Sequence, residues 1–360
     1  MCEGRVSGTH DVAEVGKISS AVFADTIFPR LGAPRDTVLV GPRHGVDTGI
    51  VDIGGGQVMA VTTDPFFVVP EYGWERAGWF AVHIVASDAA TSGLRPAYLT
   101  VDLNLPPTLS DDDFGALWEA VHEACSAIDV AVITGHTGRY DNCAFPIVGG
   151  ATAMSVGPRD AYVTPDMARA GDVVMLTKGP AIETAALFAV TFPDQISASL
   201  GADVARAGEN LFWQMSVVRD ASAAARVGVR DRGVTAMHDA TERGVVGGLV
   251  EIAEASGTGL IIDLDGVAIR PEAAAICDLF GIDPFVTSSE GTLVLTCRPA
   301  YADAVRGRLN EEGIDAFLIG EVVPAECGLR VVRGGREQSL EAPVTDPFWP
   351  AYRQALEAGP

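Results

Sequence analysis

Three aspartates in the first half of the chain, Asp47, Asp64 and Asp88, have surroundings in which a carboxylate could bind a metal ion. Asp64 follows the apolar run Val58–Val61, so we expect its carboxylate at the carboxyl end of a strand, where it can reach into a crevice. Asp88 interrupts an apolar helical stretch and must face solvent or a polar cleft. Converging carboxylates are typical ligands of Mg²⁺, which commonly bridges substrate phosphates. The alternatives are that Asp64 caps a turn at Pro65 and that Asp88 lies on a solvated helix face.

A glycine-containing segment follows the apolar run Val130–Thr134, and we interpret it as a turn. It reads Gly135-His136-Thr137-Gly138-Arg139. Free backbone N–H groups in such a turn could bind phosphate oxygens, with the side chains of Thr137 and Arg139 as further donors. His136 is a phosphate donor, a neighbour of the metal site or an ordinary surface residue.

Two polar segments in the second half could face a cleft. His238, Asp239 and Arg243 lie between a short strand and the expected helix Val245–Ala255. Asp239 or Thr241 would be the N-cap of that helix, or the exposed helix N-terminus would bind substrate. Glu290, in Ser288-Ser289-Glu290-Gly291, is a cleft carboxylate or a turn residue.

Apolar runs of strand length alternate with helical stretches in two successive series, which predicts the α+β class. We expect strands at 38–40, 58–63, 97–105, 130–134 and 147–156, then at 173–177, 235–237, 259–264, 292–297 and 316–323. Helices are expected at 77–92, 111–128, 183–190, 202–217, 245–255, 271–279 and 299–312. Breakers between Gly157 and Gly171 predict a boundary. We therefore expect domains at residues 1–160 and 161–345, facing one another across a cleft, and a tail at 346–360 that is a docked aromatic helix or a frayed end.

The charge of the chain restricts its partners. The chain has 360 residues and a net charge of -23, which disfavours binding to nucleic acid and to anionic membranes. Only Lys17 and Lys178 are lysines, and such an acidic, lysine-poor composition is typical of a salt-rich cytoplasm or of a high-GC genome. The six scattered cysteines indicate neither a zinc site nor a disulfide framework. No signal peptide or membrane-spanning segment is recognisable, so we expect a cytoplasmic protein.

The order of the short motifs resembles the aminoimidazole ribonucleotide (AIR) synthetase superfamily, nearest the hydrogenase-maturation carbamoyl dehydratase branch. The motifs that carry the resemblance span nearly the whole chain. They are Gly16-Lys17-Ile18, Gly45-Val46-Asp47, Thr63-Asp64-Pro65, Ser87-Asp88-Ala89, Thr134-Gly135-His136-Thr137, Thr177-Lys178-Gly179, His238-Asp239-Ala240-Thr241 and Ser289-Glu290-Gly291.

The resemblance implies two α/β domains per subunit and a homodimer in which the N-terminal mixed sheets pair, with ATP near that interface. It also implies that Asp47, Asp64 and Asp88 hold Mg²⁺, and that Asp64, Asp88 and Asp239 take part in catalysis. The implied cofactor-binding residues are Lys17, Gly135, His136, Thr137, Arg139 and Glu290.

Three departures from the family pattern bear on function. Val46 precedes Asp47 where many members have a second acid, and His136 stands where the nearest members have an acid. The chain ends in Ala358-Gly359-Pro360 and not in the cysteine that carries the carbamoyl group in that branch, and Cys327 is the nearest cysteine.

We expect an ATP- and Mg²⁺-dependent enzyme that phosphorylates or dehydrates an amide-type or other small acceptor, which could be a small molecule or a peptide tail. The alternatives are a non-catalytic nucleotide-binding assembly protein and a purine-pathway synthetase.

Overall fold

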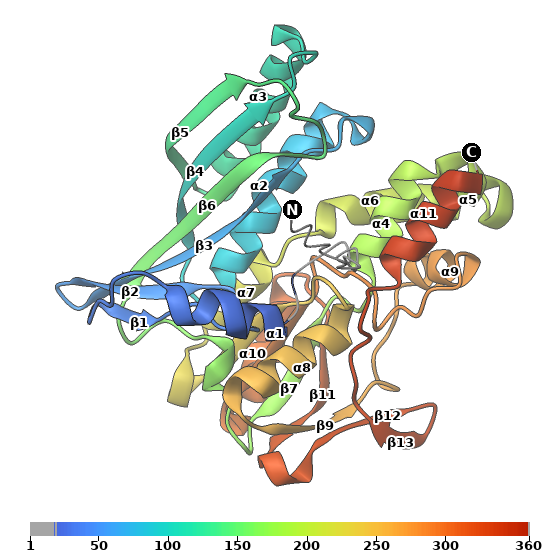
Figure 1. Cartoon of the computed structure of the whole chain (residues 1–360). Helices are drawn as coiled ribbons and strands as arrows, with labels where there is room; N and C mark the ends of the chain where they lie inside the picture. The colour runs from blue at the N-terminus through green and yellow to red at the C-terminus, as the bar shows by residue number, and fades with distance from the viewer. Residues whose placement is uncertain (1–17, 19, 359–360) are drawn as a thin grey trace, which may run out of the picture. The chain divides into compact units, whose positions relative to one another are not determined.

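The computed structural model describes residue 18 and residues 20–358 (Figure 1). The chain divides into two compact units, residues 1–35 and 36–360. In the first unit, the helix α1 (Ser20–Val22) continues into a π-helical turn at Phe23–Ile27 and a 3-10 turn at Phe28–Arg30. All remaining elements belong to the second unit.

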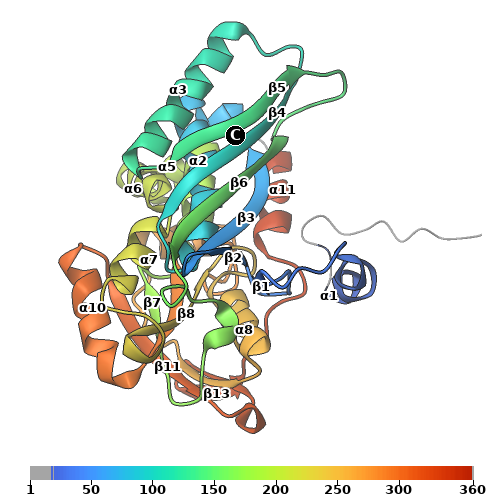
Figure 2. The same ribbon diagram turned by 90° about the vertical axis from the view of Figure 1, so that its left-hand side faces the viewer.

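The first sheet of the second unit has six strands in the order β1-β2-β3-β6-β4-β5. Their bounds are β1 Val38–Val40, β2 Gly49–Gly54, β3 Gln57–Phe67, β4 Pro96–Leu105, β5 Ala131–Arg139 and β6 Ile147–Pro158. Buried and accessible residues alternate along β4, as they do where only one face of a sheet is covered. The covering helices are α2 (Trp74–Thr91), which Figure 2 shows behind the strands, and α3 (Asp111–Ala127), which it shows to their left.

The segment 135–139 is not a turn, so that expectation is wrong. It forms the second half of β5, which pairs with β4 in parallel, Gly135 opposite Val101 and His136 opposite Asp102. A side chain at Gly135 would place its Cβ 2.4 Å from the carbonyl oxygen of Val101. This glycine therefore allows a close approach between two strands, and it does not bend the chain.

The second sheet has seven strands in the order β13-β12-β9-β11-β7-β10-β8. Their bounds are β7 Val173–Thr177, β8 Val234–Asp239, β9 Gly259–Asp263, β10 Leu293–Cys297, β11 Ala316–Val323, β12 Leu329–Arg333 and β13 Arg336–Ser339. The helix α8 (Gly244–Ser256) packs against one set of buried residues of this sheet. The helices α7 (Val218–Ala225) and α10 (Ala302–Glu311) pack against another set. The two sheets with their separate cores confirm the α+β class.

A further group of helices shares a third hydrophobic core. It contains α4 (Ile182–Thr191), α5 (Pro193–Leu200), α6 (Ala202–Asn210), α9 (Pro271–Leu279) and α11 (Phe348–Ala358). The single helix expected at 202–217 is wrong, because α6 ends at Asn210 and a 3-10 turn at Leu211–Gln214 leads into an irregular segment before α7.

The C-terminal tail forms the helix α11, which docks through its aromatic side chains and is not frayed over residues 348–358. Phe348 is 4% exposed and its ring meets that of Phe188 of α4 edge to face, with centroids 5.6 Å apart. The hydroxyl of Tyr352 lies 3.1 Å from Oγ1 of Thr191. None of the helices within residues 20–358 has the length and the apolar character needed to cross a membrane.

Candidate active site

Asp47 lies in the loop between β1 and β2 and reaches the end of β8 in the other sheet. Its Oδ2 is 3.5 Å from Nδ1 of His238, and the same nitrogen is 3.6 Å from Oδ1 of Asp239. Side-chain atoms of these three residues lie within 4.8 Å of one another, close enough to share a metal ion. The loop can approach because Gly45 lacks a side chain, since a Cβ there would lie 3.0 Å from the carbonyl oxygen of Glu251 on α8.

His238 is 1% exposed and surrounded by carboxylates. Its Nε2 lies 2.8 Å from Oε2 of Glu251, whose other oxygen accepts a hydrogen bond from Arg243, and its Nδ1 lies 2.7 Å from the carbonyl oxygen of Asp239. Burial alone would lower the pKa of His238, but Asp47, Asp239 and Glu251 outweigh it and raise that pKa well above its usual value. These carboxylates therefore favour the protonated form of the imidazole.

A second pair of acids, Glu183 and Glu290, lies next to this cluster. The backbone N–H of Glu290 donates to Oε2 of Glu183 over 3.0 Å. Burial raises the pKa of Glu183 to about 7, with further contributions from Asp346, Glu242 and Asp239, and the hydrogen bond from Glu290 opposes the rise. Glu290 is 2% exposed.

Burial also raises the pKa of Glu290 well above its usual value, with help from Asp239, Glu183 and Asp88, and a hydrogen bond from Ser87 opposes this rise. Because Asp88 lies on α2 against the first sheet and Asp239 ends β8 of the second, Glu290 lies within the electrostatic reach of acids from both.

Asp64 lies on β3 and Asp88 on α2, one of the helices that cover the first sheet. Asp88, near the end of α2, accepts a hydrogen bond of 3.1 Å from Oγ1 of Thr62 on β3. Asp64 lies two residues after Thr62 and so projects from the same face of β3. The expectation that Asp64 ends a strand or caps a turn is wrong, because β3 continues to Phe67 and pairs Asp64 with Ala151 of β6. Asp88 is half-buried, not on a fully solvated helix face.

The loops that carry Asp239 and Glu290 are joined by the buried carboxylate of Asp346, which precedes α11. Asp346 accepts hydrogen bonds from the backbone N–H of Arg243 over 2.6 Å and from the hydroxyl of Ser288 over 2.9 Å. The helix α8 therefore begins at Gly244 after Arg243, and neither Asp239 nor Thr241 caps it. This expectation is wrong because the N–H group next to the helix end is bound by a residue far along the chain.

The remaining expected cofactor residues lie elsewhere. His136 contacts Tyr140, with Nε2 2.7 Å from the hydroxyl, and Arg139 pairs with Asp111 over 2.7 Å, both at the outer edge of the first sheet. Gly135 and Thr137 lie on the same exposed strand. Lys17 is outside the described residues.

The donor set of the cluster fits a divalent cation. Asp47 and Asp239 offer carboxylate oxygens, the ligands that hard cations prefer. The acidic side chains outnumber the basic residues His238 and Arg243, so a bound metal ion would offset negative charge that is costly to bury.

Sequence reasoning did not assign Glu183, Glu251 or Asp346 to the site, and it considered His238 only as part of a helix N-terminus that could bind substrate. For His238 itself, the sequence signal was its position beside Asp239 at the end of a short strand.

Comparison with known proteins agrees with this architecture. Residues 45–171 match the N-terminal domain and residues 169–332 the C-terminal domain of AIR synthase related proteins. The carbamoyl dehydratase HypE of Rhizobium leguminosarum bv. viciae is 29% identical over 297 residues, which cover 78% of each protein.

Two solved structures have the same fold. The hydrogenase maturation protein HypE in complex with ATP has a TM-score of 0.65 and 21% identity, covering 94% of this chain and 98% of that one. ThiL complexed with AMPPCP and TMP has a TM-score of 0.69 and 19% identity, covering 90% and 97%. The chain therefore belongs to the AIR synthase related family, and its relatives include the HypE carbamoyl dehydratases.

Proposed function

We propose that the chain is an ATP- and Mg²⁺-dependent enzyme that phosphorylates or dehydrates an amide-type or other small acceptor. The observation that carries this proposal is the convergence of Asp47 from the first domain with Asp239 and His238 from the second, beside Glu290. The relatives support it, because a HypE structure contains ATP and the ThiL structure contains the ATP analogue AMPPCP.

In this proposal Asp47, Asp88 and Asp239 hold Mg²⁺, and Asp64, on β3 two residues after the Thr62 that donates to Asp88, takes part in catalysis. Bound Mg²⁺ would neutralise phosphate charge and position the phosphoryl group that is transferred. Glu183 has a pKa of about 7, so its carboxyl can hold or release a proton near neutral pH.

Pairing of two chains through the first sheet would bury apolar side chains that β5 and β6 expose in the single chain. Val132 is 38% exposed, Ile133 53% and Ile147 55%, and these apolar side chains are costly to leave in water. We propose a homodimer that covers them and brings Gly135, His136, Thr137 and Arg139 near the nucleotide, without nucleic-acid or membrane partners. Light scattering at high and low salt tests the dimer, and a monomer under both conditions contradicts it.

The function is tested by calorimetric titration of ATP with and without Mg²⁺, followed by an assay of phosphate release with carbamoyl and hydroxyl compounds. We expect Mg²⁺-dependent binding that Asp88→Asn weakens by at least about tenfold. Asp303→Asn is the control, because Asp303 is an exposed carboxylate on α10 with 88% side-chain exposure. Binding without turnover of any acceptor favours the non-catalytic assembly protein, and no binding contradicts the proposal.

A further inference from the structure

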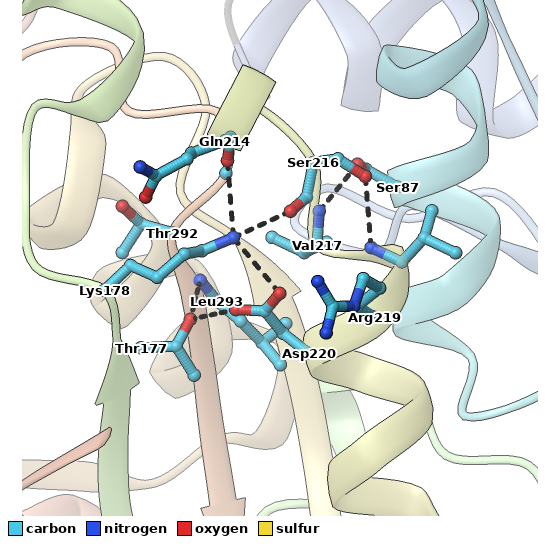
Figure 3. Close-up of polar contacts among 12 residues, drawn as sticks. Ser87, Thr177, Lys178, Gln214, Ser216, Val217, Arg219, Asp220, Thr292 and Leu293 are labelled. Atoms are coloured by element: carbon cyan, nitrogen blue, oxygen red, sulfur yellow. Dashed lines mark hydrogen bonds and ion pairs between the residues drawn. The ribbon is translucent and has the colours of Figure 1, made fainter. Parts of the chain in front are cut away.

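Lys178 directly follows β7 and is 8% exposed. Its Nζ donates to Oδ2 of Asp220 over 3.1 Å, to the carbonyl oxygen of Ser216 over 2.8 Å and to that of Gln214 over 3.3 Å. Figure 3 shows these three contacts meeting at the ammonium group. An ammonium group has three donors, so its bonding capacity is filled. The residue also adopts a left-handed backbone with φ of 60°, a conformation that non-glycine residues seldom adopt and that is concentrated at functional sites.

Two of the three acceptors belong to residues 214–217, which comprise the end of the 3-10 turn and the irregular segment before α7. We call residues 214–217 the brace. Its first contact is with α2 of the first domain. Oγ of Ser216 lies 2.8 Å from Nδ1 of His83, and the backbone N–H of Val217 donates to Oγ of Ser87 over 3.0 Å. Ser87 immediately precedes Asp88, so the brace fixes the turn of helix that carries this carboxylate.

The second contact of the brace is with the loop that carries Glu290. A Cβ at Gly291 would lie 2.2 Å from the carbonyl oxygen of Gln214, so the two backbones are pressed together and only glycine fits. Gly291 has φ of 99°, which also favours glycine. The brace thus touches the neighbours of Asp88 on one side and of Glu290 on the other.

We propose that Lys178 is a positioning residue for this site: by holding the brace, it sets the placement of Asp88 in the first domain relative to Glu290 in the second. The role rests on the proposed function, because it deepens the account of the same nucleotide and metal site. Asp220 keeps the ammonium group in place and is itself fixed by Oγ1 of Thr177, which donates to Oδ1 over 2.7 Å.

Replacing Lys178 alone would leave Asp220 as a buried, uncompensated carboxylate and would unfold part of the protein for that reason alone. The informative variant is the double substitution Lys178→Met/Asp220→Asn. It leaves no unpaired charge, because both charges are removed together, and it still removes the ammonium group that donates to the brace. The matched control is Arg219→Met, which removes a cation from the same helix, at a side chain that is 73% exposed.

Two measurements test the role. Calorimetry of ATP binding with Mg²⁺ should show the double variant about tenfold weaker than the wild type, as is usual when a residue supporting metal ligands is lost. The double variant should still unfold in one cooperative transition, and its binding without Mg²⁺ should stay near the wild-type value, as should both kinds of binding in the Arg219→Met control. Mg²⁺-dependent binding equal to the wild type in a folded double variant overturns the proposal.

Hydrogen exchange separates this proposal from the proposed function. Amides at 87–92 and 289–292 should exchange faster in the double variant than in Arg219→Met, whether or not ATP binds. If the wild type binds no ATP but this difference is present, the proposed function fails and the positioning role stands. Unchanged exchange in both segments overturns the positioning role.

Discussion

Replacing Glu183 by glutamine should change how the stability of the protein depends on pH. Burial and the neighbouring carboxylates raise the pKa of Glu183 from 4.5 to about 7. A carboxyl group with a raised pKa binds its proton more tightly in the folded state than in the unfolded state. It therefore contributes stability that is fully present below the unfolded pKa and lost as the pH rises toward the folded pKa.

The size of the effect follows from the shift. A rise from 4.5 to about 7 corresponds to about 3 kcal/mol. The carboxyl group of Glu183 is buried, but the residue as a whole is partly exposed. We therefore reduce this figure and expect the free energy of unfolding to fall by about 2 kcal/mol between pH 5 and pH 8 through this group. The glutamine of the Glu183→Gln variant cannot titrate, so this part of the decrease should vanish, while its amide oxygen can still accept the hydrogen bond from Glu290.

Urea unfolding at pH 5 and pH 8, in the presence of EDTA so that no divalent cation contributes, measures the difference. The control is Glu311→Gln on α10, a glutamate whose side chain is 70% exposed. If Glu183→Gln loses stability with pH as steeply as the wild type, within about 0.5 kcal/mol, the cluster does not hold a proton as we infer.

Three further results are expected. Asp346→Ala should lower the free energy of unfolding by about 3 kcal/mol in urea titrations, because it leaves buried donors of two loops and of α11 without their charged acceptor; Asp303→Ala should change it by less than about 0.5 kcal/mol. Phe348→Ala should cost about 3 kcal/mol and free the C-terminal helix to protease, and an unchanged cleavage rate would contradict its docking. Cys277 and Cys297 should resist a thiol reagent at pH 8 in the native protein, since burial raises the pKa of each to about 12, and rapid labelling of either, read by peptide mapping, would refute this.

The sequence predicted correctly those helices and strands whose apolar pattern and end signals are consistent along the whole element. The helix at 271–279 begins with Pro271, a favoured first residue, and its observed bounds agree with the expectation. The strand at 316–323 is likewise found as expected. The prediction of a turn at 135–139 was wrong because Gly135 allows close contact between two strands. A glycine in a sequence can indicate either a turn or such a close contact, and the sequence alone does not distinguish them.

The site was predictable only in part, because its contacts join residues far apart in the chain. Asp47, Asp88, Asp239 and Glu290 were recognisable as polar residues next to apolar runs. Nothing local indicates that His238 meets Asp47, or that Asp346 joins the loops before α8 and after Phe285. Such contacts follow from the packing of the two sheets and the tail, which periodicity does not determine.

The most direct test of the central claim is the position of the metal ion. Crystals grown with AMPPCP and Mn²⁺ in place of Mg²⁺ would locate it by anomalous scattering. We expect a peak bounded by Asp47, Asp88 and Asp239, next to Glu290 and absent in Asp239→Asn. Ordered nucleotide with no manganese at these carboxylates, or manganese bound only at the outer strand β5, would contradict the account.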